Sequence, residues 1–116
     1  HVNNAIFATF LETGRVEVLY SLEFPILSEG ASFVIASLKL DFLKEIKWPG
    51  QVDTGTGIFK IGNSSIRIIQ KLYQNEKCVA NAETVVVQVD DNTGRGSPLT
   101  ENAKKTLSGW LISVID

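Results

Sequence analysis

The order of periodicities along the chain restricts it to an α+β fold. One stretch with helical spacing comes first, and four stretches with strand alternation follow. The helical stretch places apolar residues three and four apart, at Ile6, Phe7, Phe10, Leu11, Gly14, Val18 and Leu19. Further apolar residues flank this stripe, which is typical of a buried helix. Gly14 lowers helix propensity by about 1 kcal/mol relative to Ala, so we expect another backbone, such as that of a sheet wrapping the helix, to approach it closely.

The four later stretches predict strands, separated by turn residues. They are Phe33–Phe42, Gln51–Ile61, Ser65–Gln74 and Lys77–Asp90. Period-two spacing predicts that the following residues of the first strand share one face: Val34, Ala36, Leu38, Leu40 and Phe42. The short Asn75-Glu76 connection predicts a tight turn between the last two strands.

A short C-terminal helix is expected after Thr100, whose side chain can cap it. This helix is expected to carry Leu107, Trp110 and Leu111, with Glu101 and Lys105 paired one turn apart. Four consecutive antiparallel strands form a meander, and its apolar face must cover something. The first helix is the one candidate long enough, because sixteen residues span about 24 Å, enough to cross four or five strands.

Composition limits the classes of function. The 116 residues predict one domain, residues 1–116, and the 44% hydrophobic content indicates a folded chain. A net charge of −2 gives no reason to expect a nucleic-acid or membrane surface, and no apolar run is long enough to span a bilayer. The single cysteine, Cys78, excludes an intrachain disulfide framework and favours a reducing, cytoplasmic compartment.

The polar tetrad His1-Val2-Asn3-Asn4 stands where the chain enters the first helix. Asn3 or Asn4 can cap the helix, whose first backbone N–H groups are free to bind a ligand oxygen. Two interpretations stay open, a cap alone or the lining of a ligand site. The chain contains no methionine and begins inside this motif, so we expect further residues upstream.

The tetrad, together with Phe10-Leu11-Glu12 and Arg15, resembles the acyl-CoA thioesterases related to 4-hydroxybenzoyl-CoA thioesterase. Three later segments resemble the same family in compatible order: Leu40 to Leu43, Lys60 to Ser65, and Gly94 to Leu99. The resemblance implies a hot-dog fold, in which a long central helix is wrapped by an antiparallel meander. It also implies a homodimer or homotetramer with sites between subunits, and no metal or redox cofactor, since coenzyme A enters as part of the substrate.

In this family an Asp lies just upstream of the tetrad and acts on the thioester. Because the sequence starts at His1, the first strand and that Asp are expected to lie outside it. The resemblance implies catalytic roles for His1 and Asn3, with Glu12 as an alternative base. It implies a substrate site lined by Asn4, Phe7, Asn63, Ser64 and Ser65, and contacts of Lys60 and Arg67 with coenzyme A phosphates.

Each of these roles has a structural alternative. The asparagines can serve only as caps, Phe7 can serve only as core, and the Asn63–Ser65 segment can be an ordinary turn. Lys60, Arg67 and Lys71 can be solvated strand charges, and Glu12 can bond within the helix. The leading expectation is an acyl-CoA thioesterase; the alternatives are a non-catalytic acyl-CoA or acyl-carrier-protein binder and, less favoured because the chain has one histidine, a hydratase.

Overall fold

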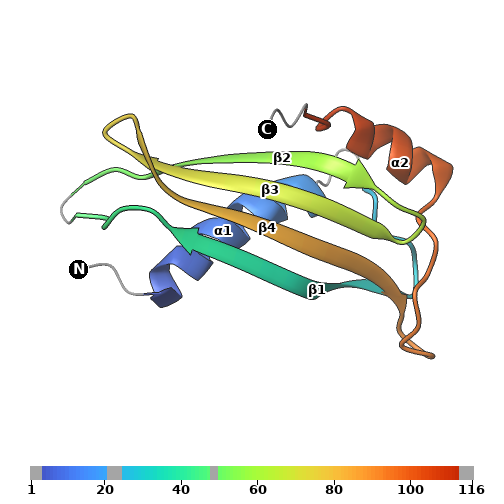
Figure 1. Cartoon of the computed structure of the whole chain (residues 1–116). Coiled ribbons are helices and arrows are strands. Elements are labelled where there is room, and N and C mark those ends of the chain that lie inside the picture. Colours follow the sequence, from blue (N-terminus) through green and yellow to red (C-terminus); the bar gives the residue numbers. More distant parts are fainter. Residues whose placement is uncertain (1–3, 21–24, 48–49, 113–116) are drawn as a thin grey trace.

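The computed structural model describes residues 4–20, 25–47 and 50–112 as two helices beside a four-stranded antiparallel sheet (Figure 1). Helix α1 spans Asn4–Leu19 and helix α2 spans Glu101–Ser108. The strands are β1 (Ala31–Phe42), β2 (Asp53–Ile61), β3 (Ser65–Gln74) and β4 (Lys77–Asp90). The expected order of elements is confirmed, and each strand lies within two residues of its predicted bounds.

The strands are arranged in the order β1-β4-β3-β2. The expected meander is therefore confirmed for β2, β3 and β4, whereas β1 pairs with β4 at the far edge. Asn75 and Glu76 connect β3 to β4 with φ of 51° and 64°, the left-handed backbone of a two-residue hairpin turn. The order of β1 and β2 was not predictable from local pattern, because the connection between them joins opposite edges of the sheet.

Helix α1 lies close against one face of the sheet at Gly14. A β-carbon at this position would stand 2.5 Å from Thr56 Oγ1 and 2.7 Å from Gln70 Nε2. The sheet does approach the helix closely at this glycine, but the expectation of another backbone is wrong, because the nearest atoms belong to side chains of β2 and β3. Only a residue without a side chain lets the helix reach this depth.

Strand β1 contains a bulge that reverses part of the predicted face. Ile35 lies opposite Val86 and Ser37 lies opposite Val85, so Ala36 is an extra residue in the ladder. The expectation that Val34 shares a face with Leu38, Leu40 and Phe42 is therefore wrong. Ile35 takes its place on the helix-facing side.

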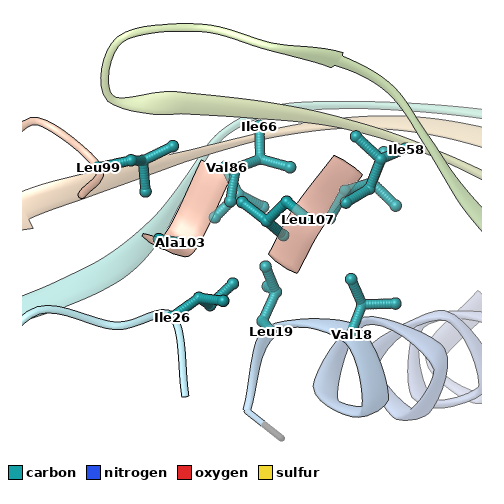
Figure 2. Packing of buried hydrophobic residues seen from close by; sticks show 10 residues of the cluster. Val18, Leu19, Ile26, Ile58, Ile66, Val86, Leu99, Ala103 and Leu107 are labelled. Carbon is teal, nitrogen blue, oxygen red and sulfur yellow. The ribbon is translucent and has the colours of Figure 1, made fainter. Parts of the chain in front are cut away.

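The apolar core lies between the sheet and the two helices. One buried cluster joins α2 and the end of α1 to the sheet, and Figure 2 shows Leu107 of α2 among its members: Val18, Leu19, Ile26, Ile58, Ile66, Ile68, Val86, Leu99, Ala103 and Leu107. A second cluster surrounds the earlier part of α1: Phe7, Leu11, Ile46, Leu72, Val79, Ala80 and Ala82. Thr100 caps α2 as expected, since its Oγ1 accepts from Ala103 N at 3.0 Å.

The end of α2 differs from the expectation in two ways. Trp110 and Leu111 lie beyond the helix, where Ile58 N donates to Trp110 O at 2.9 Å and Ile112 N donates to Ile58 O at 2.8 Å. The segment thus continues along the edge of β2 after Gly109 instead of extending the helix. Glu101 pairs with Lys104, at 3.7 Å, rather than with Lys105.

Three buried glutamines attach crossing segments to the helix-facing side of the sheet. Gln70 Nε2 donates to Leu11 O of α1 at 2.8 Å. Gln74 accepts from Lys47 N and donates to Lys47 O, both at 2.8 Å. Gln88 accepts from Ser28 N at 3.0 Å and donates to Pro98 O at 3.1 Å. Each amide satisfies both of its ends inside the core, as a buried polar group requires.

Candidate functional site

The start of α1 is the first part of the candidate site. His1 and Asn3 lie outside the described residues, and Asn4 begins the helix. The first-turn N–H groups of any helix lack partners within it and carry the positive end of its dipole. No acidic residue occupies this turn. The described chain therefore offers donors for a developing oxyanion here, and a carboxylate must come from elsewhere.

Phe7 is placed one turn into the helix, against the end of β1. It is buried and meets Phe42 edge to face, with ring centroids 4.8 Å apart. Phe7 also belongs to the second apolar cluster with Leu72 and Val79. The ring fixes the start of α1 relative to β1, while Phe42 itself is half exposed beside it.

Glu12 and Arg15 line a groove between α1 and β1. Its volume is about 200 Å³, and its other walls are Val16, Leu19, Tyr20, Phe33, Val34, Ile35 and Val86. Glu12 is exposed, whereas Arg15 is buried and donates to Gln70 Oε1 at 3.4 Å. Burial lowers the pKa of Arg15, and the nearby Glu12 opposes this shift. The groove therefore combines apolar walls with one buried cation.

The Asn63–Ser65 turn lies at the other end of the sheet. Its backbone is fixed by neighbouring segments, because Leu99 N donates to Asn63 O at 2.9 Å and Gln88 N donates to Ser64 O at 2.8 Å. The exposed Lys60 and Arg67 lie directly opposite each other on β2 and β3, one step from this turn. Two cations are thus brought together beside a rigid turn with hydroxyl groups.

Within one chain these two parts of the site are far apart. Phe42 marks the end of β1 near the helix start, and it pairs with Ala80, which pairs with Leu72. Ser65 precedes Leu72 by seven residues of β3, a separation of ~23 Å. One chain therefore does not bring Asn4 and the Asn63–Ser65 turn to one ligand thioester.

Three buried polar residues, one on α1 and two on the sheet, were not among the predicted site residues. They are Arg15, Gln70 and Thr84, all less than a tenth exposed. The signal was a polar residue interrupting an apolar alternation, as Gln70 does between Ile68 and Leu72. Thr84 Oγ1 is buried without a hydrogen-bond partner among the described residues.

Cys78 is half-buried, and its Sγ lies 3.4 Å from Ala80 O. Among the described residues, no group of three His, Cys, Asp or Glu side chains could hold a metal ion. In the same residues, no helix combines the length and apolar character needed to cross a membrane.

The comparisons with known proteins point in one direction. The family model described as the thioesterase-like superfamily matches residues 1–107. A predicted thioesterase from Bacillus stearothermophilus has a TM-score of 0.84 and 25% identity, over 98% of this chain and 86% of that one. No curated protein matches the chain.

Two structures determined with coenzyme A are also similar. A thioesterase from Thermus thermophilus, complexed with coenzyme A and Zn, has a TM-score of 0.76 and 28% identity, over 92% of this chain and 83% of that one. The hypothetical protein SAV2348 from Staphylococcus aureus, in complex with CoA, has a TM-score of 0.81 at 10% identity, over 99% and 77% of the two chains. At that identity the second likeness shows the fold alone.

Proposed function

We propose, from the premise that this chain belongs to the thioesterase-like superfamily, that it hydrolyses an acyl-CoA thioester to a free acid and coenzyme A. The observation that carries the proposal is the family match, which begins at the tetrad and includes α1, the whole sheet and most of α2. In this proposal α1 is the central helix of a hot-dog fold. Coenzyme A enters as part of the substrate, and no separate cofactor takes part.

The thioester carbonyl is proposed to bind at the start of α1. The first-turn N–H groups and the positive end of the helix dipole would stabilise the charge that develops on its oxygen. His1, Asn3 and Asn4 are the proposed tetrad contacts, and Phe7 is proposed to border the acyl group there. Glu12 lies eight residues beyond Asn4, about 12 Å along the axis, so it does not reach a thioester at its own helix start. We propose Glu12 as an alternative base for a thioester held by a second subunit.

A homodimer through the free edge of β1 would complete the site. In the part of the chain that the structure describes, β1 pairs only with β4, which leaves its other edge open. Beside this edge several large apolar side chains are 42–52% exposed: Val16, Tyr20, Val34, Ile35, Leu38 and Phe42. Antiparallel pairing of two β1 strands about a twofold axis would cover them and continue the sheet.

The twofold axis would also join the two separated parts of the site. The Phe42 end of β1 in one subunit meets the Ala31 end in the other, because the paired strands run in opposite directions. The helix start of one subunit then approaches the end of the sheet that carries the Asn63–Ser65 turn in its partner. Asn63, Ser64 and Ser65 are proposed to contact the pantetheine arm, and Lys60 with Arg67 the phosphates of coenzyme A.

The alternative is a protein that binds acyl-CoA, or an acyl carrier protein, without hydrolysing it. It is favoured by the lack of an acidic residue in the first turn of α1. The test is thiol release from acyl-CoAs ranging from acetyl to palmitoyl and benzoyl, alongside calorimetric binding of the same compounds. Turnover above the buffer rate supports the enzyme, and binding without turnover supports the binder. If the protein neither hydrolyses nor binds any of them, the proposed hydrolysis and the binding of acyl-CoA both fail, and binding of an acyl carrier protein is then tested with the carrier itself.

A further inference from the structure

The groove between α1 and β1 is apolar except for its two charged residues. Val16, Leu19 and Tyr20 form its helix wall, while Phe33, Val34, Ile35 and Val86 form its sheet wall. Tyr20 meets Phe33 edge to face at the Ala31 end of the groove, with ring centroids 5.8 Å apart. Such a groove suits an acyl chain, and the buried cation in it requires a separate explanation.

The positive charge of Arg15 is buried, and in the described chain few groups stabilise it. It is 9% exposed, and its hydrogen bond goes to the neutral Oε1 of Gln70 at the long distance of 3.4 Å. A guanidinium has five N–H donors in a planar fork that fits a carboxylate, and buried charges are normally paired. Glu12 acts on Arg15 electrostatically, but its exposed side chain is in contact with water, which screens it.

An unpartnered hydroxyl lies one step along the sheet from the Arg15–Gln70 contact. Thr84 is fully buried on β4, and its Oγ1 has no hydrogen-bond partner among the described residues. Its neighbours on the same face are Ala82, which lies opposite Gln70, and Val86, which lines the groove, so Thr84 lies next to the groove wall without lining it. A buried hydroxyl without a hydrogen-bond partner destabilises the folded protein, because it has given up its hydrogen bonds to water. A ligand oxygen that accepts from this hydroxyl would restore one such bond.

From these positions we infer that Arg15 and Thr84 form a polar subsite for a carboxylate at the far end of the acyl group. The substrate class is then the CoA thioesters of dicarboxylic acids. The inference rests on the proposed function and specifies its substrate. In the proposed dimer the partner's helix start faces the Ala31 end of this groove, so the thioester sits on one subunit while the acyl tail enters the other.

The test compares glutaryl-CoA with pentanoyl-CoA, which match in chain length and differ in the terminal carboxylate. The wild-type protein is expected to show kcat/KM at least tenfold higher for glutaryl-CoA, roughly the effect of one charge-assisted pair. Arg15→Gln should remove most of that preference by slowing glutaryl-CoA hydrolysis. Lys105→Gln removes an exposed positive charge on α2 and should leave the ratio unchanged.

Thr84→Val is the second variant. It keeps the shape of the side chain, and it tests the subsite even if Arg15→Gln does not fold. It should lower the glutaryl to pentanoyl ratio severalfold, with an intact thermal transition by circular dichroism. A wild-type protein that hydrolyses pentanoyl-CoA equally well or better overturns the inference and leaves the proposed function standing. If neither thioester is hydrolysed, the wider acyl-CoA panel decides the proposed function, and calorimetry decides the inference: equal affinity for glutaryl-CoA and pentanoyl-CoA overturns it.

Discussion

Gln70 Nε2 donates to the backbone carbonyl of Leu11 at 2.8 Å, which joins the middle of strand β3 to the middle of helix α1. The same amide nitrogen lies 3.1 Å from Thr56 Oγ1, and the amide oxygen accepts from Arg15. One side chain therefore sets the depth of the helix on the sheet and positions Arg15, the one cation among the described residues that line the groove.

Replacing Gln70 with Leu should destabilise the fold. Leucine is apolar and similar in size to glutamine, so the substitution removes the three hydrogen bonds of the amide and leaves Arg15 without its acceptor. We expect a loss of about 1–3 kcal/mol in the free energy of unfolding, measured by urea denaturation. Gln51→Leu changes an exposed glutamine and should shift stability by less than ~0.5 kcal/mol. Equal stability of the two variants would contradict the role given to Gln70.

Gly14→Ala should destabilise the protein although alanine is the better helix former. The new β-carbon would stand 2.5 Å from Thr56 Oγ1 and 2.7 Å from Gln70 Nε2, so these side chains or the helix must shift. Overpacking of this kind costs about 1–3 kcal/mol, more than the helix propensity gained. Thermal unfolding of the variant measures the difference.

Two matched variants separate the steric effect in Gly14→Ala from helix propensity. Gly109→Ala places a β-carbon 3.4 Å from Thr106 O, at a helical φ of −65°, and should be tolerated. Gly14→Ala combined with Thr56→Ala should lose less stability than the sum of the single variants, because the second change removes the nearer of the two clashing atoms. Strict additivity would show that the clash with Thr56 is not the cause.

Local pattern predicted the elements well because it determines each element by itself. Alternation in β3 places Ile66, Ile68 and Leu72 on the buried face, and Thr100 caps α2 as its position before the helix indicates. The register of β1 depends on a distant partner instead. The residues around Ala36 give no signal of a bulge. The bulge arises from pairing with residues of β4 that lie about 50 positions later in the sequence.

The candidate site could be predicted from the sequence less well than the elements, for a similar reason. Family motifs indicated the tetrad and the Asn63–Ser65 turn, yet the fold places the start of α1 and this turn at opposite ends of the sheet. Arg15 is one turn from Glu12 in a helix whose charged residues are mostly exposed, so its burial follows from the proximity of Gln70 and β1. Burial of this kind is a tertiary property and has no local signal.

The proposed dimer predicts that Leu38→Lys yields a monomer. Leu38 is 45% exposed on β1, so a lysine there does not disturb the core of one chain but would place a charge in the paired edge. Light scattering coupled to size exclusion measures the mass of each species. Leu111→Lys, at a leucine 48% exposed beside β2, is the matched control and should remain dimeric. A wild-type protein that is monomeric at micromolar concentration would refute the arrangement.

Asp90, the last residue of β4, should make the stability of the protein depend on pH in the acidic range. Its carboxylate accepts from Asn92 N at 2.8 Å and Thr93 N at 2.9 Å, and these bonds lower its pKa from 3.8. A group whose folded pKa is depressed contributes stability above its unfolded pKa and loses it as pH falls through the folded value. Asp90→Asn should therefore melt lower than wild type at neutral pH, with the gap narrowing only below pH 3.8. A gap that is constant down to about pH 3 would contradict the assignment.

Thr84→Val should raise stability in the absence of ligand. The hydroxyl of Thr84 is fully buried and has no hydrogen-bond partner among the described residues, so the unfolded state solvates it better than the core does. Replacing it with a methyl group of similar size should add about 1 kcal/mol to the free energy of unfolding in urea. Thr13→Val provides the comparison, since that hydroxyl is exposed and donates to Thr9 O at 3.0 Å, and the change in the free energy of unfolding should be within ~0.5 kcal/mol.

Destabilisation by Thr84→Val would mean that the hydroxyl of Thr84 has a hydrogen-bond partner in the ligand-free protein. A gain in stability together with a loss of selectivity for the carboxylate would show that the core keeps this hydroxyl at a cost in stability because the substrate uses it.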